Sequence, residues 1–473
     1  MRNLKKFISR TAILFILFVL SLFISLLKKG LNDLKKEKED ENLSNLLLKE
    51  DKDIKKTIDL MKKYPKNQKI HKNGCFGLFQ ISKTNEKLLN EVLKDEGIEI
   101  IINSMNNFPN NPKIQEKSIS ILTKISKDLK IQNKIRELKG IETIINIMNY
   151  LPNYQEIQKN GLRALANIAY ENEENQNKIT ELQGIETIIN AMNKFPENEE
   201  IQEFGLRALA NIAYKNEGNR NKITELKGIE LIINPMNKFP ENEEIQEFGL
   251  RSLANIANYK NQNKIRELKG IETIINAMNK FPKNEVIQEK GCGALWNIAI
   301  FDKQNQNKIR ELQGIETIIN AMNKFPKNEE IQKNGCRFLA MMAYDNTENQ
   351  NKIRELQGIE TIINAMNKFP ENEEIQKNGC WSLLNIACNT ENQNKITELK
   401  GIETIFNAMN KFPENEEIQK NGLGALWSIA LNEENLNKMK ELNRIELIQK
   451  AMDKFPNNRD IQNWGSELLT KLQ

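Results

Sequence analysis

The chain has 473 residues, of which 39% are hydrophobic and 28% charged, and its formal net charge is +5. Residues 1–38 hold nine Lys or Arg and two Asp or Glu, so the rest of the chain carries 60 basic and 62 acidic residues. This balance argues against bulk binding of nucleic acid, which depends on clustered basic side chains.

The first 27 residues predict a membrane anchor. Residues 1–10 contain four basic side chains, and Thr11–Leu27 is a run of 17 residues without a charge. At about 1.5 Å per residue, such a helix spans roughly 25 Å, slightly less than the hydrocarbon core of a bilayer. We therefore predict a basic region and hydrophobic signal anchor or transmembrane segment at 1–27, followed by a charged juxtamembrane linker at 28–44. A cleaved signal peptide, a membrane-surface helix and a wrongly assigned start are the alternatives.

The cysteines indicate on which side of the membrane the rest of the chain lies. Basic residues flank the apolar run on both sides, so the positive-inside rule barely discriminates. The five cysteines form no Cys-x-x-Cys pair and are odd in number, which favours a reducing compartment. The chain has a single glycosylation sequon, which begins at Asn42. We therefore expect the remainder of the chain to be membrane-anchored and cytoplasmic.

From residue 45 onward the chain is a tandem repeat with a period of 42 to 44 residues. A Gly-Ile-Glu triplet marks eight copies, and a proline follows each glycine by twelve residues. The glycines are Gly97, Gly140, Gly184, Gly228, Gly270, Gly314, Gly358 and Gly401. Pro65 and Pro456 extend the proline series to ten copies. Helical patterning at this period predicts an all-α stacked solenoid of about thirty helices over residues 45–473.

The copy at residues 175–214 illustrates the three helices expected in each repeat. Asn175 is expected to cap a short first helix, and Gly184 to end that helix with a positive φ. The second helix carries an apolar stripe on one face, formed by Ile185, Ile188, Ile189 and Met192. Asn198 is expected to cap the third helix. Gly205 lies inside that helix at a cost of about 1 kcal/mol, which predicts that a neighbouring helix approaches closely there.

Cysteine, histidine and proline each give a more local prediction. Cys75, Cys292, Cys336 and Cys380 all follow the third-helix glycine, where other copies have Leu, so we expect buried apolar positions. Because His71 is the only histidine, no zinc pattern exists, and we predict neither a metal nor a cofactor. Pro235 stands inside a second helix where other copies have Ala, which favours a local kink over a site.

The order of a short helix, Gly-Ile, a second helix and then EIQKNGLRALANIA (156–169) resembles the armadillo repeat. The form GC-x-AL-x-NIA is similar to that of the vacuolar armadillo proteins and of the armadillo segments of leucine-rich-repeat kinases. The resemblance covers residues 45–473 and implies a right-handed superhelical solenoid of about ten three-helix repeats. No kinase motif stands in the chain, so the resemblance does not imply catalysis.

The resemblance also implies a peptide-binding groove along the third helices, where family members hold extended peptides with Asn amides. The matching positions here are Arg163, Asn167, Arg207, Asn211, Arg251, Asn255, Asn297, Arg337, Trp381 and Asn385. Arginine mostly replaces the Trp that importin-type members place four residues before the Asn. This departure disfavours basic ligands and is closer to β-catenin, whose basic groove takes acidic segments. Alternatively, the Arg and Asn side chains simply form a solvated helix face.

These observations predict a membrane-tethered, non-catalytic scaffold that binds extended acidic or phosphorylated segments of other proteins. The chain has a single histidine and lacks the phosphate-binding glycine loop and the nucleophile motif of an enzyme, so we expect no catalysis and no small-molecule substrate. We also expect no nucleic-acid partner, because base-reading repeats vary from copy to copy and these are nearly identical. The alternatives are a secreted or soluble armadillo adaptor after signal cleavage, and a nuclear-transport or nucleic-acid-associated helical repeat.

Overall fold

A computed structural model describes residues 25, 28–29, 54–84 and 96–473. These described residues form 28 α-helices and no strand, which confirms the all-α prediction. The chain divides into two compact units, Met1–Thr187 and Ile188–Gln473. Each unit is a stack of three-helix repeats, and we describe each by itself.

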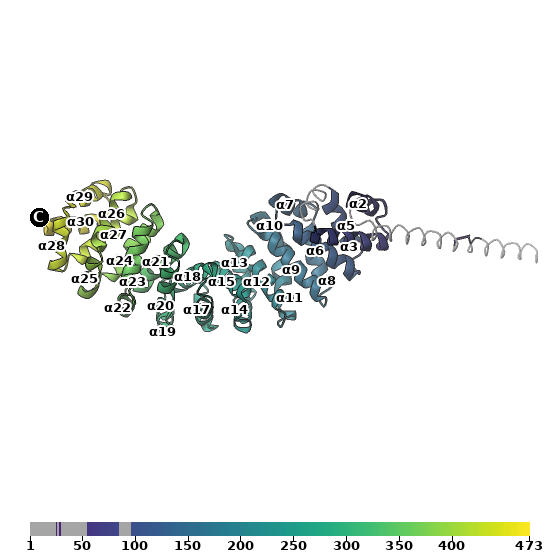
Figure 1. The fold of residues 1–473 in the computed structure, drawn as a ribbon, viewed down its shortest axis with the longest axis horizontal. Helices are drawn as coiled ribbons and strands as arrows, with labels where there is room; N and C mark the ends of the chain where they lie inside the picture. Colours follow the sequence, from purple (N-terminus) through teal and green to yellow (C-terminus); the bar gives the residue numbers. More distant parts are fainter. Residues whose placement is uncertain (1–24, 26–27, 30–53, 85–95) are drawn as a thin grey trace, which may run out of the picture. The chain divides into compact units, whose positions relative to one another are not determined.

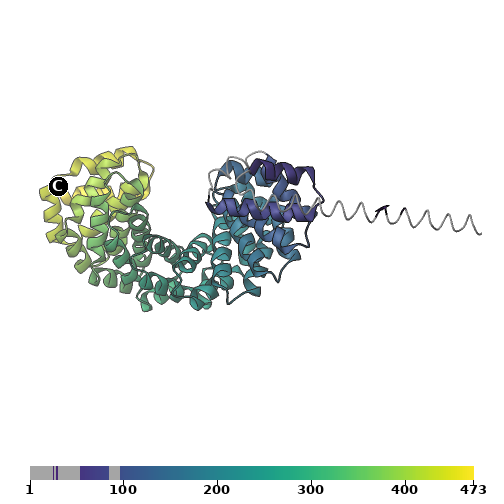
Figure 2. The same ribbon diagram turned by 45° about the vertical axis from the view of Figure 1, so that its right-hand side comes forward.

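The helices follow one another in chain order within each unit (Figures 1 and 2). The first unit contains α2 (Ile54–Lys63), α3 (Gln68–Thr84), α5 (Ile98–Asn107), α6 (Pro112–Ile125), α7 (Leu129–Glu137), α8 (Gly140–Tyr150), α9 (Gln155–Ala169) and α10 (Glu173–Glu181). The residues of α11 (Gly184–Lys194) fall on both sides of the division. The second unit contains α12 (Glu199–Ala213), α13 (Glu217–Glu225), α14 (Gly228–Lys238), α15 (Glu243–Ile256), α16 (Gln262–Glu267), α17 (Gly270–Lys280), α18 (Glu285–Ala299), α19 (Lys303–Glu311), α20 (Gly314–Lys324), α21 (Glu329–Ala343), α22 (Thr347–Glu355), α23 (Gly358–Lys368), α24 (Glu373–Ile386), α25 (Thr390–Glu398), α26 (Gly401–Lys411), α27 (Glu416–Ile429), α28 (Glu433–Leu442), α29 (Ile445–Lys454) and α30 (Arg459–Leu472).

The third helix of each repeat packs mainly against the third helices of the adjacent repeats. In the first unit these are α3, α6 and α9; in the second they are α12, α15, α18, α21, α24, α27 and α30 (Figure 1). Second helices such as α14, α17 and α20 pack on one another in the same order. The third helices therefore form one continuous layer within each unit, and any side chain at a fixed repeat position recurs along that layer.

A glycine of the third helix meets a methionine of the second helix in nine repeats, which confirms the close approach expected at Gly205. A Cβ atom built on Gly291 would overlap Sδ and Cγ of Met278. The same overlap recurs at Gly74, Gly161, Gly205, Gly249, Gly335, Gly379, Gly422 and Gly465. Because the methionine fills the space of the missing side chain, the axial position of each third helix is fixed against its own second helix.

The prediction that the repeat glycine ends the first helix with a positive φ was wrong. The positive φ lies one residue earlier, as at Lys227 (62°) and Gln313 (62°), and no described glycine has a positive φ. The glycine is instead the first residue of the second helix, as Gly270 is in α17. A Cβ atom there would lie 2.5 Å from Cγ2 and 2.9 Å from the carbonyl oxygen of Ile265. Close approach, rather than backbone conformation, therefore requires this glycine.

One of the two predicted helix caps was also wrong. Asn172, not Asn175, caps α10, and its side chain accepts a hydrogen bond from the Asn175 amide. Asn175 is buried, and its Nδ2 donates to the Ile168 carbonyl at 2.9 Å. Asn198 caps α12 as predicted, by accepting a hydrogen bond from the Ile201 amide at 2.9 Å. Asn172 and Asn175 are three residues apart, and either residue type can cap a helix. Asn175 instead satisfies the buried Ile168 carbonyl, which leaves the capping position to Asn172.

The predicted cysteine positions are confirmed, since Cys75, Cys292, Cys336 and Cys380 are all fully buried. Helix α14 runs unbroken through the buried Pro235, with the same length as its counterparts. The predicted anchor at Thr11–Leu27 lies outside the described residues apart from Ser25. Among the helices that the structure does describe, none has the length and apolarity needed to span a bilayer.

Two glycines of α18 allow a matched test of the helix contact. Replacing Gly291 by Ala should destabilise the protein by about 1–3 kcal/mol, because the new methyl group would displace Met278. Replacing Gly293 by Ala should be neutral or stabilise by up to about 1 kcal/mol, because the nearest neighbour of its Cβ is Asn334 Nδ2 at 3.7 Å. Urea unfolding followed by circular dichroism measures both changes, and equal effects of the two substitutions would contradict the proposed packing.

Candidate functional site

The most distinctive polar feature of the third-helix layer is a row of arginines in the second unit, Arg207, Arg251 and Arg337, which we call the arginine row. Arg207 and Arg251 lie on helices α12 and α15 and are partly buried. Their guanidinium carbons lie 5.4 and 5.6 Å from the centroid of the Phe248 ring. A guanidinium packed over an aromatic face gains about 0.5–1 kcal/mol and loses rotational freedom. Phe248 therefore helps to hold two successive members of the row in place.

The third arginine of the row is held more tightly. The Arg337 guanidinium on α21 lies 3.6 Å from the centroid of the Trp296 ring on α18. Burial lowers the pKa of Arg337, and the charges of Glu374 and Glu330 oppose that shift. Between Arg251 and Arg337 the row has a gap, because α18 carries Gly293 at the corresponding position.

An internal carboxylate competes for the row. Glu247 Oε1 lies 2.9 Å from a terminal nitrogen of Arg251, one turn away on the same helix. Burial raises the pKa of Glu247, and the charge of Arg251 opposes that shift. A ligand carboxylate that reached Arg251 would have to replace or share this pairing.

Four of the asparagines predicted to bind peptide backbone also hydrogen-bond the backbone of the protein itself. In the second unit Nδ2 donates to a carbonyl oxygen of the preceding third helix: Asn255 to Ala210 at 3.0 Å, Asn297 to Ala254 at 2.9 Å and Asn385 to Ala340 at 2.9 Å. In the first unit, Asn167 donates to Thr123 in the same way, at 2.9 Å. One N–H of each of these amides thus joins adjacent third helices, and the amide keeps a second N–H and its oxygen.

The structure places the remaining predicted site residues as follows. Arg163 is exposed on α9, and Asn167, four residues later on the same helix, is buried; both lie in the first unit. Asn211 on α12 is buried, and Trp381 on α24 is half-buried. The second unit therefore brings together three arginines, four asparagines and one tryptophan on its layer of third helices.

Sequence reasoning missed the aromatic supports of the arginine row. Phe248 stands three residues before Arg251, a spacing at which helical side chains touch, so this contact could have been predicted. Trp296 supports an arginine of the next repeat, and that contact depends on how two helices are aligned. Glu247, four residues before Arg251, was also visible in the sequence as an i, i+4 ion pair.

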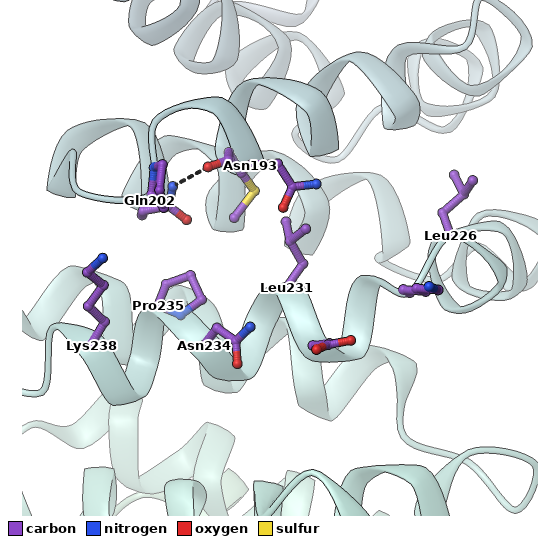
Figure 3. Close-up of a pocket in the computed structure, with 11 residues that line it drawn as sticks. Asn193, Gln202, Leu226, Leu231, Asn234, Pro235 and Lys238 are labelled. Atoms are coloured by element: carbon purple, nitrogen blue, oxygen red, sulfur yellow. Dashed lines mark hydrogen bonds between the residues drawn. The ribbon is translucent and has the colours of Figure 1, made fainter.

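A second surface feature is a cavity of about 500 Å³ between α11 and α14, lined by residues 192–238 of the second unit (Figure 3). Leu231 and Pro235 point into it from α14, opposite Asn193 and Gln202 (Figure 3). Similar cavities of about 540 and 490 Å³ lie between other second helices, near Thr361 and Leu447. The cavity is therefore a recurring consequence of stacking rather than a distinct site.

Two of these cavities, at Leu231 and at Leu447, lack a hydrogen bond that is present at other junctions. At other junctions a threonine hydroxyl contacts an asparagine of the preceding second helix, as between Thr273 Oγ1 and Asn237 Oδ1 at 2.9 Å. Leu231 has no hydroxyl and therefore cannot form this contact with Asn193. Leucine in place of threonine adds an apolar side chain to the cavity lining and no chemically reactive group.

Titratable side chains with metal-binding or nucleophilic chemistry are dispersed over the repeats. Within the described ranges, no group of three or more His, Cys, Asp or Glu side chains is arranged to hold a metal ion. Burial raises the pKa of the Cys75 thiol to about 11 and that of the Cys336 and Cys380 thiols to about 12. These thiols are therefore protonated at neutral pH and act as small apolar side chains.

With this geometry established, the comparisons with known proteins identify the family. The sequence matches the family profile described as LRRK2 ARM repeat over residues 6–221 and 354–473. The chain belongs to the LRRK2 ARM repeat family. This membership confirms the predicted armadillo architecture, including its resemblance to the armadillo segments of leucine-rich-repeat kinases. None of the curated proteins matches the chain.

Two solved structures support the same fold. An engineered protein from the Northeast Structural Genomics Consortium is 22% identical, with a TM-score of 0.72 over 89% of this chain and 98% of its own. A second structure is 12% identical to this chain, with a TM-score of 0.66. It comes from work on a conserved phosphorylation switch that controls the interaction between cadherin and β-catenin. It covers 89% of this chain and 90% of its own. At these identities the likeness concerns the fold alone.

Proposed function

We propose that this armadillo-repeat protein is a non-catalytic scaffold that binds extended acidic or phosphorylated segments of other proteins along the third-helix layer. The observation that carries the proposal is the support of the arginine row by aromatic rings. Guanidinium groups held in place lose little entropy on binding, and they pair with carboxylate or phosphate through two parallel hydrogen bonds. The spacing of packed helices, about 8–10 Å, corresponds to two or three residues of an extended peptide.

The ligand exchanges with the internal carboxylate of Glu247. Because burial disfavours the charged form of Glu247, an incoming phosphate with more charge and more acceptor oxygens competes well for Arg251. Asn255 and Asn297 stay bound to the helix layer through one N–H and use the other on ligand backbone. The structural neighbour associated with a phosphorylation switch between cadherin and β-catenin supports a phosphorylated ligand by analogy.

Acidic binding is tested by reversing the charge of the arginine row. Arg207, Arg251 and Arg337, replaced together by Glu, should weaken binding of an extended Glu/Ser-alternating peptide by at least about 100-fold, with a larger loss for its serine-phosphorylated form. Fluorescence anisotropy with a labelled 16-residue peptide measures the affinity, and the Gln/Ser analogue reports non-specific binding.

A matched control makes the same charge change on the other side of the repeats. Lys194, Lys324 and Lys368 are exposed on second helices, and their joint replacement by Glu should leave the affinity within about threefold of the wild-type value, because only screened long-range charge changes. An equal loss in both triple variants would show a general charge effect and would exclude the arginine row as the site.

We also propose that Thr11–Leu27 tethers the scaffold to a membrane, with its repeats on the cytoplasmic side. The uncharged length of this run and the unpaired cysteines support the arrangement. A secreted or soluble adaptor released by signal cleavage, and a nuclear-transport or nucleic-acid-associated repeat, are the competing functions.

Tethering is tested in cells that express the full chain. The wild-type protein should stay in the membrane fraction after carbonate extraction, and deletion of residues 1–27 should release it, because the apolar run is removed. Glycosylation at Asn42 would place the repeats on the opposite side, and a mature protein that begins near residue 28 would exclude the anchor.

A further inference from the structure

A line of ion pairs connects successive repeats of the second unit where their second helices end. The last residue of a second helix, a lysine, pairs with the glutamate that follows the proline of the preceding repeat. Lys280 on α17 lies 2.5 Å from Glu241. Three more pairs have the same arrangement: Lys238 with Glu197, Lys411 with Glu371 and Lys454 with Glu414. These contacts show that the two positions face each other across a repeat junction.

At two successive junctions lysine stands in place of that glutamate. Lys283 therefore occupies the position opposite Lys324, and Lys327 the position opposite Lys368. All four side chains are exposed, and within residues 96–473 no carboxylate pairs with any of them. Two ammonium groups at facing positions repel each other, so an anion from outside the chain that lies between them is attracted by both.

A cavity of about 540 Å³ between α20 and α23, which we call the α20–α23 cavity, lies at the second of these junctions. Lys327 and Lys368 both line it. None of the described residues that line this cavity is acidic. By contrast, Glu230 lines the cavity between α11 and α14, and Asp453 lines the cavity near Leu447. Among these three cavities, the α20–α23 cavity is therefore the one with an uncompensated positive charge.

The uncharged polar groups of the α20–α23 cavity add hydrogen-bond donors. Thr361 Oγ1 lies 3.2 Å from Asn323 Oδ1, so the amide nitrogen of Asn323 can donate to a ligand. Asn364 on α23 is exposed and lines the same cavity. Glu329 and Glu330, the next acidic residues along the chain, are already engaged, one by an asparagine amide and the other by a lysine. The surroundings therefore favour an anionic group with several acceptor oxygens.

We propose that the α20–α23 cavity binds a small molecule that carries a phosphate group, with the phosphate between Lys327 and Lys368. A phosphate monoester carries a charge of about −1.5 to −2 at neutral pH, so one such group can balance two ammonium groups, whereas a single carboxylate cannot. Its three oxygens accept hydrogen bonds from the lysines and from the asparagine amides. The cavity volume lies in the range of about 300–1,000 Å³ that is usual for small-molecule sites.

The test titrates the full chain in detergent with fructose 1,6-bisphosphate, followed by isothermal titration calorimetry. Saturable binding is expected, and the substitution Lys327→Glu should weaken it at least about tenfold, because the glutamate repels phosphate and pairs with Lys368. This substitution installs the residue that other repeats already have, so the melting temperature should not fall. Lys260→Glu makes the same charge change on another exposed part of the second unit, and it should leave the affinity within about threefold of the wild-type value.

Two further ligands test the chemical class. Fructose should not bind, and citrate, which carries carboxylates instead of phosphates, should bind at least about tenfold more weakly than the bisphosphate. Absence of bisphosphate binding, equal losses in Lys327→Glu and Lys260→Glu, or equal affinity for citrate would each overturn the proposal. Binding only of vesicles that contain phosphoinositides would assign the lysines to a membrane surface, and binding only of the phosphorylated Glu/Ser peptide would assign them to a protein ligand.

The site is separable from the arginine row. The triple Glu variant of the arginine row should bind the bisphosphate as the wild type does. The triple variant of Lys194, Lys324 and Lys368 should lose the bisphosphate and keep the acidic peptide. Loss of both ligands in the same variant would contradict two independent sites.

Discussion

The contact between a second-helix methionine and a third-helix glycine sets the geometry on which both units depend. At Gly291 the methionine side chain occupies the volume that a Cβ atom would need, and eight other third helices have the same arrangement. Helix interiors disfavour glycine by about 1 kcal/mol relative to alanine, so nine such residues are a considerable cost in helix stability. The cost is offset by packing, because each third helix can lie in only one axial position against its partner.

Because the axial position of each third helix is fixed, side chains that recur in the sequence also line up in rows on the surface of the third-helix layer. Within the second unit, residues at one repeat position recur once per third helix, which produces the arginine row and the asparagine contacts between helices. The arginines lie along the partly exposed face of these helices, so one packing contact sets their positions relative to one another.

The repeat architecture could be predicted from the sequence because the repeat length and the buried positions are both visible in residues that recur from copy to copy. Gly205 indicated a close helix contact, and the cysteine positions indicated burial, since Leu replaces Cys in other copies. The residues that cap the first helices were harder to predict from the sequence. Asn172 and Asn175 are both suitable caps, and the choice between them depends on which carbonyl becomes buried. The positive φ at the end of the first helix belongs to Gln183 and not to Gly184. Glutamine has no preference for the left-handed region, so the sequence does not indicate this position.

The candidate site was predicted as a set of residues but not as a set of contacts. The armadillo resemblance selected the arginine and asparagine positions, yet it could not reveal that Asn255 already joins two helices or that Trp296 supports Arg337. Both facts depend on alignment between repeats, which a single sequence does not encode visibly.

The central claim is that the third-helix layer, and not the second-helix surface with its cavities, is where protein ligands bind. Hydrogen–deuterium exchange of the full chain, with and without the saturating phosphorylated Glu/Ser peptide, measures this directly. The account predicts slower exchange in α12, α15, α18 and α21 and unchanged exchange in α14, α17 and α20. Slower exchange confined to the second helices, with the peptide bound, would contradict it.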